Sequence, residues 1–166
     1  MKKQFSILKK GFFFLALAFA TMPVFAQSKL LVGYWRLTAA DKILPGGSEA
    51  ADYGTDPRGI AIFTADGHYV IEIFRSDRMK FASGDRAKGT PEEYKDAVLS
   101  ASCHFGTYTV DEGKGTITFH TDRASFPNWD ETTRVASFTL DGDKLDWHSS
   151  ARPDGTIPVS VFSRVP

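Results

Sequence analysis

The sequence predicts an all-β fold, an eight-stranded antiparallel up-and-down barrel with one short α-helix. From residue 32 onward the chain reads as short segments in which apolar and polar residues alternate. Three pairs of these segments are joined by tight turns, and two of the turns are Asp-Gly, a strong hairpin signal. Only residues 90–102 have helical periodicity. A meander of this kind closes into a barrel because closure removes its exposed edges.

Residues 1–26 have the features of a signal peptide. A basic start, "MKKQFSILKK", precedes the apolar stretch "GFFFLALAFATMPVFA", and Val24 and Ala26 supply small residues at positions −3 and −1 of a cleavage site. A membrane anchor is the alternative, but the apolar run is short for a span. We therefore expect cleavage before Gln27, export to the periplasm or beyond, and one barrel domain over residues 27–166.

Charge and cysteine content limit the partners of the exported domain. Four of the 20 basic residues lie in the signal segment, so 16 remain against 20 acidic residues and the net charge is −4. This balance disfavours a nucleic-acid partner, and no second stretch is long and apolar enough to span a membrane. The single cysteine, Cys103, has no intramolecular disulfide partner, and a buried, inert thiol is favoured over a reactive one.

Eight strands are expected, and each begins or ends at a recognisable turn or loop. In the first, Gly33, Trp35 and Leu37 share one face. Asp66-Gly67 and Asp141-Gly142 connect two of the hairpins, and "DEGKG" connects a third. The expected strands span residues 32–38, 59–64, 68–75, 103–110, 115–121, 133–140, 144–149 and 157–164.

The segment "TPEEYKDAVLSAS", residues 90–102, is expected to be helical. Thr90 is a favourable N-cap, Pro91 suits the first helical position, and Glu93 completes a capping box. Apolar side chains then recur on one face, at Tyr94, Ala97, Val98 and Ala101. We expect this face to pack against one end or flank of the sheet.

The lengths of the connections predict two different barrel ends. In a meander, successive connections alternate between the ends, and here the long ones are 39–58, 76–102, 122–132 and 150–156. All long loops therefore fall at one end and all tight turns at the other, as in a cup. The eleven-residue connection that contains "SFPNW" lies at the mouth, where Phe126 and Trp129 would form a rim or lid, or else plug a solid core.

Several stretches resemble a known family. They are "LVGYWRL", "DPRGIAIFTADGHY", "MKFASGDRAKGTPEE", "FGTYTVDEGKGTITFH", "SFPNW" and "FTLDGDKL", in the order found in bacterial and fungal lipocalin-like domains. Gly33-x-Trp35 resembles the lipocalin G-x-W signature. The resemblance implies a lipocalin-like barrel with an internal cavity, and no single reaction. The family pattern has two basic residues before "F-x-L-D-G-D", whereas this chain has Ala136-Ser137, with Arg134 slightly earlier.

The parity of the connections also positions the G-x-W tryptophan. The alternation of connections predicts that Trp35 lies at the closed end of the barrel, together with Arg164 near the end of the last strand. A guanidinium stacked over an indole face would close that end by cation–π packing.

Polar and aromatic residues near the mouth are candidates for ligand binding. Strand alternation puts His104 and Tyr108 on one face, where the pair could hydrogen-bond a carbonyl or hydroxyl group. For each candidate the alternative is a satisfied structural hydrogen bond or, for Arg58, a solvated turn. The full set is Arg58, Arg75, His104, Tyr108, His120, Phe126, Asn128, Trp129 and Arg134.

Catalytic and cofactor motifs are weak or absent. Glu72 would be a general-base candidate if Val70, Glu72 and Phe74 faced inward, and a solvated residue if Tyr69, Ile71 and Ile73 did. The four histidines lack metal-ligand spacing, there is no G-x-S-x-G motif, and Cys103 and His104 point to opposite faces of a strand. Phosphate loops and dinucleotide fingerprints are also missing, so we expect neither a metal nor a cofactor.

Three functions remain open at this stage. The leading one is an exported barrel that binds a small, largely apolar or amphipathic molecule, with an acid, a sterol-like or a polyketide-like compound suiting the Arg, Tyr and His side chains. The second is an isomerase, cyclase or dehydratase in the same cavity, using His104, Tyr108, Glu72 or His120. The third is a solid-cored envelope protein that acts through protein contacts. The oligomeric state is left open.

Overall fold

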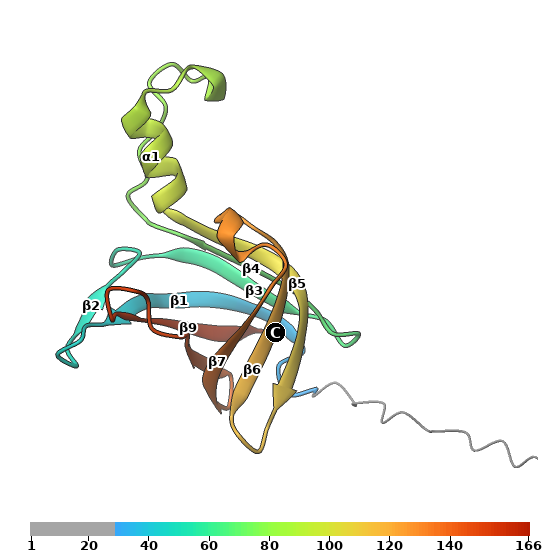
Figure 1. Cartoon of the computed structure of the whole chain (residues 1–166). Coiled ribbons are helices and arrows are strands. Elements are labelled where there is room, and N and C mark those ends of the chain that lie inside the picture. Colours follow the sequence, from blue (N-terminus) through green and yellow to red (C-terminus); the bar gives the residue numbers. More distant parts are fainter. Residues whose placement is uncertain (1–28) are drawn as a thin grey trace, which may run out of the picture.

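A computed structural model describes residues 29–166, and the expected signal peptide lies outside that range. The described chain contains nine strands and three helical segments (Figure 1). The strands are β1 (Gly33–Ile43), β2 (Glu49–Ala51), β3 (Arg58–Phe63), β4 (His68–Phe74), β5 (Ala101–Asp111), β6 (Thr116–Ala124), β7 (Thr132–Asp141), β8 (Lys144–His148) and β9 (Ile157–Val165). The helices are η1 (Arg86–Lys88), α1 (Pro91–Leu99) and η2 (Pro127–Trp129).

Eight of these strands form the closed antiparallel barrel that the sequence predicts. Each pairs with its neighbour in the chain, and β9 returns to pair with β1 from Tyr34↔Val165 to Ile43↔Ile157, which closes the sheet. The ninth strand, β2, has only three residues and pairs with the mouth end of β1. It was not predicted, because "EAA" is too short to show alternation.

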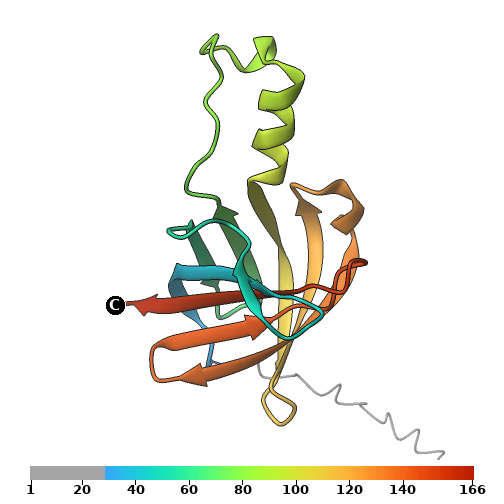
Figure 2. The ribbon, with the colours of Figure 1, turned by 90° about the vertical axis from the view of Figure 1, so that its left-hand side faces the viewer.

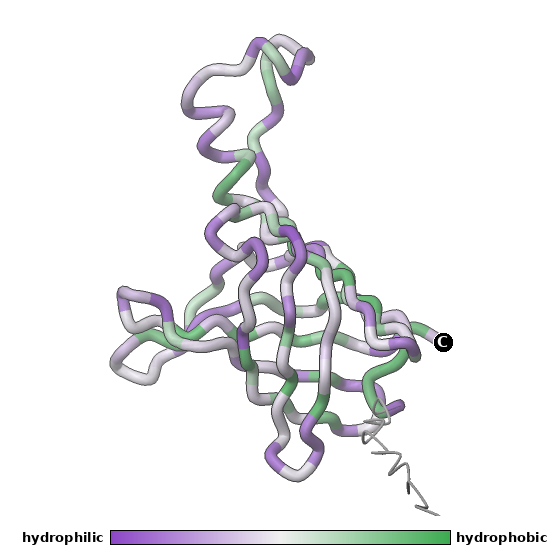
Figure 3. The backbone as a smooth tube through the Cα atoms, turned by 45° about the vertical axis from the view of Figure 1, so that its right-hand side comes forward, coloured by the Kyte–Doolittle hydropathy of each residue, from purple (hydrophilic) through white to green (hydrophobic). Residues whose placement is uncertain are grey.

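The two barrel ends differ as expected. Tight turns connect β3 to β4, β5 to β6 and β7 to β8 at one end, whereas the long connections, including α1 and η2, gather at the other (Figures 1 and 2). In the tight turns Gly67 and Gly142 have φ angles of 88° and 56°, which favour glycine. The turns at this end are largely hydrophilic, while hydrophobic residues recur along the strands (Figure 3).

The closed end is sealed by Arg164 and Trp35, as predicted. The guanidinium carbon of Arg164 lies 4.0 Å from the centroid of the Trp35 ring, which is fully buried. Arg164 also donates to the carbonyls of Val32 (2.8 Å) and Leu30 (2.9 Å), so the N-terminal segment is tied across the floor. A Cβ at Gly33 would come within 3.0 Å of the Arg164 Nη1, and the φ of 140° there favours glycine.

Aromatic side chains fill the floor half of the barrel. Phe63 meets Tyr108 edge-on at 4.9 Å between ring centroids, and Trp147 stacks on Phe162 at 4.4 Å. Tyr69 packs against Phe119 at 4.8 Å, which places this layer midway up the interior. These rings are buried and form one continuous core. Above them the interior is hollow.

Helix α1 has the predicted capping box but not the predicted packing. Thr90 and Glu93 cap each other's backbone reciprocally. The helix stands away from the barrel (Figures 1 and 2), and Val98 and Leu99 are exposed. The expectation that its apolar face covers the sheet is wrong, because Tyr94 instead packs against Phe81 of the preceding loop.

Candidate functional site

The mouth half of the barrel encloses a cavity of about 930 Å³. Phe119 and Trp147 form its floor, and Ile71, Ile73 and Ala136 contribute apolar wall. A largely apolar cavity of this size with a few polar groups is typical of a site for a drug-sized molecule. The barrel is therefore filled at the floor and hollow at the mouth.

The cavity also opens sideways, between β7 and the segment that follows β8. The β7–β8 ladder ends at Ser137↔His148, so the first half of β7 pairs only with β6. Thr133 and Val135 point outward from that half of β7, and both border the cavity together with Ser149. A molecule can thus approach through the wall as well as through the mouth.

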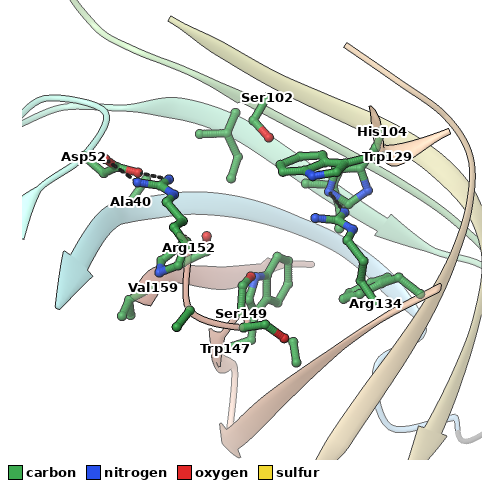
Figure 4. A pocket seen from close by; sticks show the side chains of 18 of the residues that line it. Ala40, Asp52, Ser102, His104, Trp129, Arg134, Trp147, Ser149, Arg152 and Val159 are labelled. Carbon is green, nitrogen blue, oxygen red and sulfur yellow. Dashed lines mark hydrogen bonds and ion pairs between the residues drawn. The ribbon is translucent and has the colours of Figure 1, made fainter. Parts of the chain in front are cut away.

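A polar group centred on Arg134 lies at one side of the cavity (Figure 4). The guanidinium carbon of Arg134 is 4.0 Å from the centroid of the Trp129 ring. Its Nη2 donates to His104 Nε2 at 3.2 Å, while its Nε is buried without a hydrogen-bond partner. Among residues 29–166 no carboxylate lies within ion-pairing distance of Arg134. It is a stacked but uncompensated cation.

His104 is held neutral by its surroundings. Burial, and next the positive charge of Arg134, lower the pKa of His104 to about 3. Because a guanidinium only donates, His104 Nε2 must accept, and the ring hydrogen is then on Nδ1. Nδ1 lies 3.0 Å from the Tyr69 hydroxyl, which is in turn 3.1 Å from Thr121 Oγ1. This chain of hydrogen bonds fixes His104 as an acceptor for Arg134 and leaves no free ring nitrogen for acid–base chemistry.

The loop between β6 and β7 positions Trp129 over Arg134. The Ala124 amide donates to Asp130 Oδ1 (2.8 Å), and Thr132 Oγ1 donates to the Trp129 carbonyl (2.7 Å), so both sides of η2 are tied down. Phe126 meets Trp129 edge-on at 5.6 Å and is 47% exposed. The long loop therefore builds an aromatic rim at the cavity entrance rather than a buried plug.

A second charged group lies across the cavity from Arg134 (Figure 4). Arg152 binds Asp52 through two hydrogen bonds, one of them 3.1 Å from Nη1 to Oδ1. Lys42 Nζ is 3.3 Å from the same carboxylate. Burial, and next the charge of Asp52, raise the pKa of the adjacent Tyr53. Hydrogen bonds from Thr156, and next the charges of Arg152 and Lys42, lower the pKa of Asp154, which also borders the cavity. Two carboxylates therefore balance two cations at this side.

Sequence reasoning missed this second group and the role of Tyr69. Asp52 and Arg152 come from two long connections and are separated by 100 residues in the chain, so no local pattern pairs them. The role of Tyr69 was missed because the sequence did not decide whether Tyr69 or Val70 faces the barrel interior. The only available signal was an Asp and an Arg in two loops assigned to the same barrel end.

Four of the predicted ligand-binding residues border the cavity. They are His104, Phe126, Trp129 and Arg134, which come from β5, the β6–β7 loop and β7. The alternation predicted for β5 is confirmed, because His104 and Tyr108 are buried and Phe105 is exposed.

Tyr108 does not join His104 at the cavity. Its ring is fully buried in the floor half of the barrel, and its hydroxyl donates to the Thr64 carbonyl at 3.1 Å. The expected His104–Tyr108 pair is therefore wrong. Tyr69 from β4 takes the position beside His104 instead.

The remaining four polar candidates point away from the cavity. Arg58 is exposed and pairs with Asp56 (2.8 Å), and Asn128 is exposed on η2. Arg75 is engaged by Asp77 (2.5 Å) and by Asp96 of α1, so it ties the helical excursion to the barrel. His120 lies on the outer face of β6, where Nδ1 is 3.0 Å from Thr133 Oγ1. None of these four residues borders the cavity. A nearby carboxylate holds Arg58 and Arg75 outside it, strand parity turns His120 outward, and Asn128 is exposed on η2.

Glu72 and Cys103 also face outward. Tyr69, Ile71 and Ile73 are the inward residues of β4, which puts Glu72 on the outer face, opposite Cys103. Glu72 is thus no base for the cavity. Cys103 is half-buried, and burial together with the charge of Glu72 raises the pKa of its thiol.

Residues 29–166 contain no cluster of three or more His, Cys, Asp or Glu side chains that could hold a metal ion. None of the helices in the same range has the length and apolar character that crossing a bilayer requires.

A closed eight-stranded up-and-down barrel, with an arginine stacked on the G-x-W tryptophan at its floor, defines a lipocalin-type barrel. The chain belongs to the family of lipocalin-like domains, whose model matches residues 32–159.

Similar solved structures have low sequence identity to this chain. A lipocalin-like protein from Bacteroides uniformis is 14% identical, with a TM-score of 0.43 over 81% of this chain and 98% of the other. An uncharacterized protein from Bacteroides eggerthii is 16% identical, with a TM-score of 0.40 over 81% and 99%. A variant of the fluorescent protein UnaG is 11% identical, with a TM-score of 0.36 over 81% and 95%. No curated protein matches.

Proposed function

We propose that this protein is exported and binds a small, largely apolar or amphipathic molecule in its barrel cavity. The observation that carries the proposal is the half-filled interior. A folded β-barrel of this size has enough side chains to fill its core, yet a cavity of about 930 Å³ with mostly apolar walls opens from its mouth half. An apolar void without an occupant forfeits packing energy, which favours a role for the space.

The other two functions receive less support. A protein that acts only through surface contacts has no need of a hollow interior. An acid–base enzyme needs a titrating group in contact with its substrate, whereas both ring nitrogens of His104 are engaged and Glu72 faces outward. Ligand binding is the function that uses the cavity as it is built.

The first test is native mass spectrometry of the protein purified from the periplasm, followed by denaturing extraction. We expect one small molecule to be released per chain. The mass of the protein alone tests export, because cleavage before Gln27 would leave residues 27–166. An uncleaved, cytoplasmic protein would contradict the export half of the proposal.

A second test uses a neutral fluorescent probe, N-phenyl-1-naphthylamine, and two neighbouring residues of β7. Ala136 is buried and borders the cavity, whereas Ser137 is exposed on the other face. Ala136→Trp should fill the cavity and weaken probe binding at least about tenfold, while the matched Ser137→Trp should leave it unchanged. A folded wild-type protein that fails to bind the probe, or equal binding by both variants, would exclude the cavity as the site.

A further inference from the structure

Arg134 lacks the counter-charge that a desolvated cation requires. Burial lowers the pKa of its guanidinium, although an arginine remains protonated under all ordinary conditions. A guanidinium carries five N–H donors, yet among residues 29–166 its hydrogen-bonding neighbours are two uncharged groups, His104 Nε2 at 3.2 Å and the Tyr69 hydroxyl. Arg134 is half-buried and its Nε is fully buried, and an unpaired charge in such a position is costly, so its retention favours a compensating partner.

The protein supplies such a partner to the other cavity arginine. Arg152 binds the Asp52 carboxylate through two hydrogen bonds, and Asp154 balances the second cation there, Lys42. The cavity thus has one neutralised end and one end with a single free positive charge (Figure 4).

We propose that the cavity ligand is an organic acid whose carboxylate binds the guanidinium of Arg134. This inference rests on the proposed function and adds the chemical class of the ligand. The carboxylate takes the place of the missing counter-ion, and the apolar body of the ligand lies along Phe119, Trp147 and Ile71. The acid end faces Arg134 because the two cations at the opposite end are already balanced by Asp52 and Asp154.

The charge and shape of this group favour a carboxylate over a phosphate. His104 is neutral, so the group carries one positive charge and matches a monoanion. A dianionic phosphate would bring a second negative charge without a partner. Trp129 covers one face of the guanidinium, Nε is buried, and Nη2 already donates one hydrogen to His104, so the terminal edge formed by Nη1 and the second hydrogen of Nη2 remains for the ligand. Planar carboxylates bind such an edge through paired, charge-assisted hydrogen bonds.

The experiment compares two probes that differ only in the head group, 11-(dansylamino)undecanoic acid and its methyl ester. Binding is followed by dansyl fluorescence on the mature protein. We expect the acid to bind at least tenfold more tightly than the ester, which corresponds to about 1.4 kcal/mol. Decanoic acid should likewise displace the bound acid at a concentration at least about tenfold lower than decan-1-ol.

Arg134→Gln tests the residue itself. Glutamine removes the charge but keeps an N–H donor for His104 Nε2, so the hydrogen-bond chain through Tyr69 can persist. We expect the acid to bind this variant only as tightly as the ester does, with ester affinity unchanged. Arg58→Gln is the matched control, because Arg58 is also at the mouth but is exposed and points away from the cavity. It should keep the wild-type preference.

The outcomes separate this inference from the function on which it rests. Equal binding of acid and ester by the wild-type protein overturns the carboxylate site and leaves the cavity function standing. An undiminished preference for the acid in folded Arg134→Gln overturns the role of Arg134. Failure of both probes to bind the folded wild-type protein overturns the proposed function as well. The wild-type comparison and the decanoic acid displacement need no variant, so they hold even if Arg134→Gln fails to fold.

Discussion

The barrel contains two arginine–tryptophan stacks with the same spacing and different surroundings. At the floor Arg164 covers Trp35, and at the mouth Arg134 covers Trp129, each at 4.0 Å from guanidinium carbon to ring centroid. The floor arginine also binds two backbone carbonyls and lies 3.3 Å from an oxygen of Asp143. The mouth arginine has a buried Nε without a partner.

This difference teaches that stacking geometry alone does not indicate function. A stack whose arginine also binds backbone carbonyls and a carboxylate of the protein stabilises the fold. A stack with a desolvated, unused charge beside a cavity is prepared for something that is not part of the chain. The predictions that follow test this division, from the largest expected effect to the smallest.

Removing the tryptophans should separate the two stacks most clearly. Trp35 is fully buried, so Trp35→Ala should lower the free energy of unfolding by about 3–5 kcal/mol. Trp129 is only partly buried, and Trp129→Ala should lower it by less than about 2 kcal/mol while weakening acid binding. Urea denaturation measures both. Similar losses for the two variants would abolish the distinction.

Acid should destabilise the mouth stack through His104. Its pKa is about 3 when folded and near 6.5 when unfolded, so below pH 6.5 the unfolded chain binds a proton that the native state excludes. The contribution of His104 is therefore complete above pH 6.5 and is lost as the pH falls towards 3. Between pH 7.5 and 4.5 the loss is about 2.5 kcal/mol.

The measurement is the difference in unfolding free energy between these two pH values. His104→Gln should show a smaller pH dependence than wild type by about that amount. His120→Gln, which changes an exposed histidine, should keep the wild-type dependence. If the unfolding free energy of His104→Gln changed with pH as much as that of the wild type, His104 would not be held neutral.

The fold could be predicted from the sequence because its signals are local. Strand alternation, Asp-Gly turns and connection lengths together predict the barrel and its two ends, and parity with the family resemblance predicts Arg164 over Trp35. The cavity was only partly predictable. His104 and Arg134 were found, but residues 68–75 are apolar on both faces, so alternation could not choose Tyr69 over Val70. The Asp52–Arg152 pair forms between two loops that are far apart in the sequence, and no local sequence pattern predicts that these loops meet.

Arg164→Gln should destabilise the floor by about 2 kcal/mol. It removes the cation–π contact and leaves the Val32 and Leu30 carbonyls without their charged donor. Thermal unfolding should show a lower Tm, with binding of the dansyl acid unchanged at temperatures where the variant is folded. Loss of acid binding in the folded variant would contradict a purely structural floor.

Arg134→Gln should have the smallest effect on stability, within about 1 kcal/mol of wild type. Loss of the stacking and of a charged donor is offset by relief of an unpaired buried charge. Chemical denaturation of the ligand-free protein measures the change. A loss as large as that of Arg164→Gln would show that Arg134 serves the fold first.

Helix α1 and the loop before it form a separate unit that projects from the barrel. Its excursion leaves the barrel after Phe74 and returns at Ala101, which are paired with each other, and the Arg75 amide donates to the Ser100 carbonyl across the neck at 2.9 Å. Above that neck the loop and α1 satisfy each other's hydrogen-bonding groups; for example, the Ala82 amide donates to Glu93 Oε1. A short turn could therefore replace the excursion without changing the strand register. The same position could accept a grafted domain, with the cup left intact beneath it.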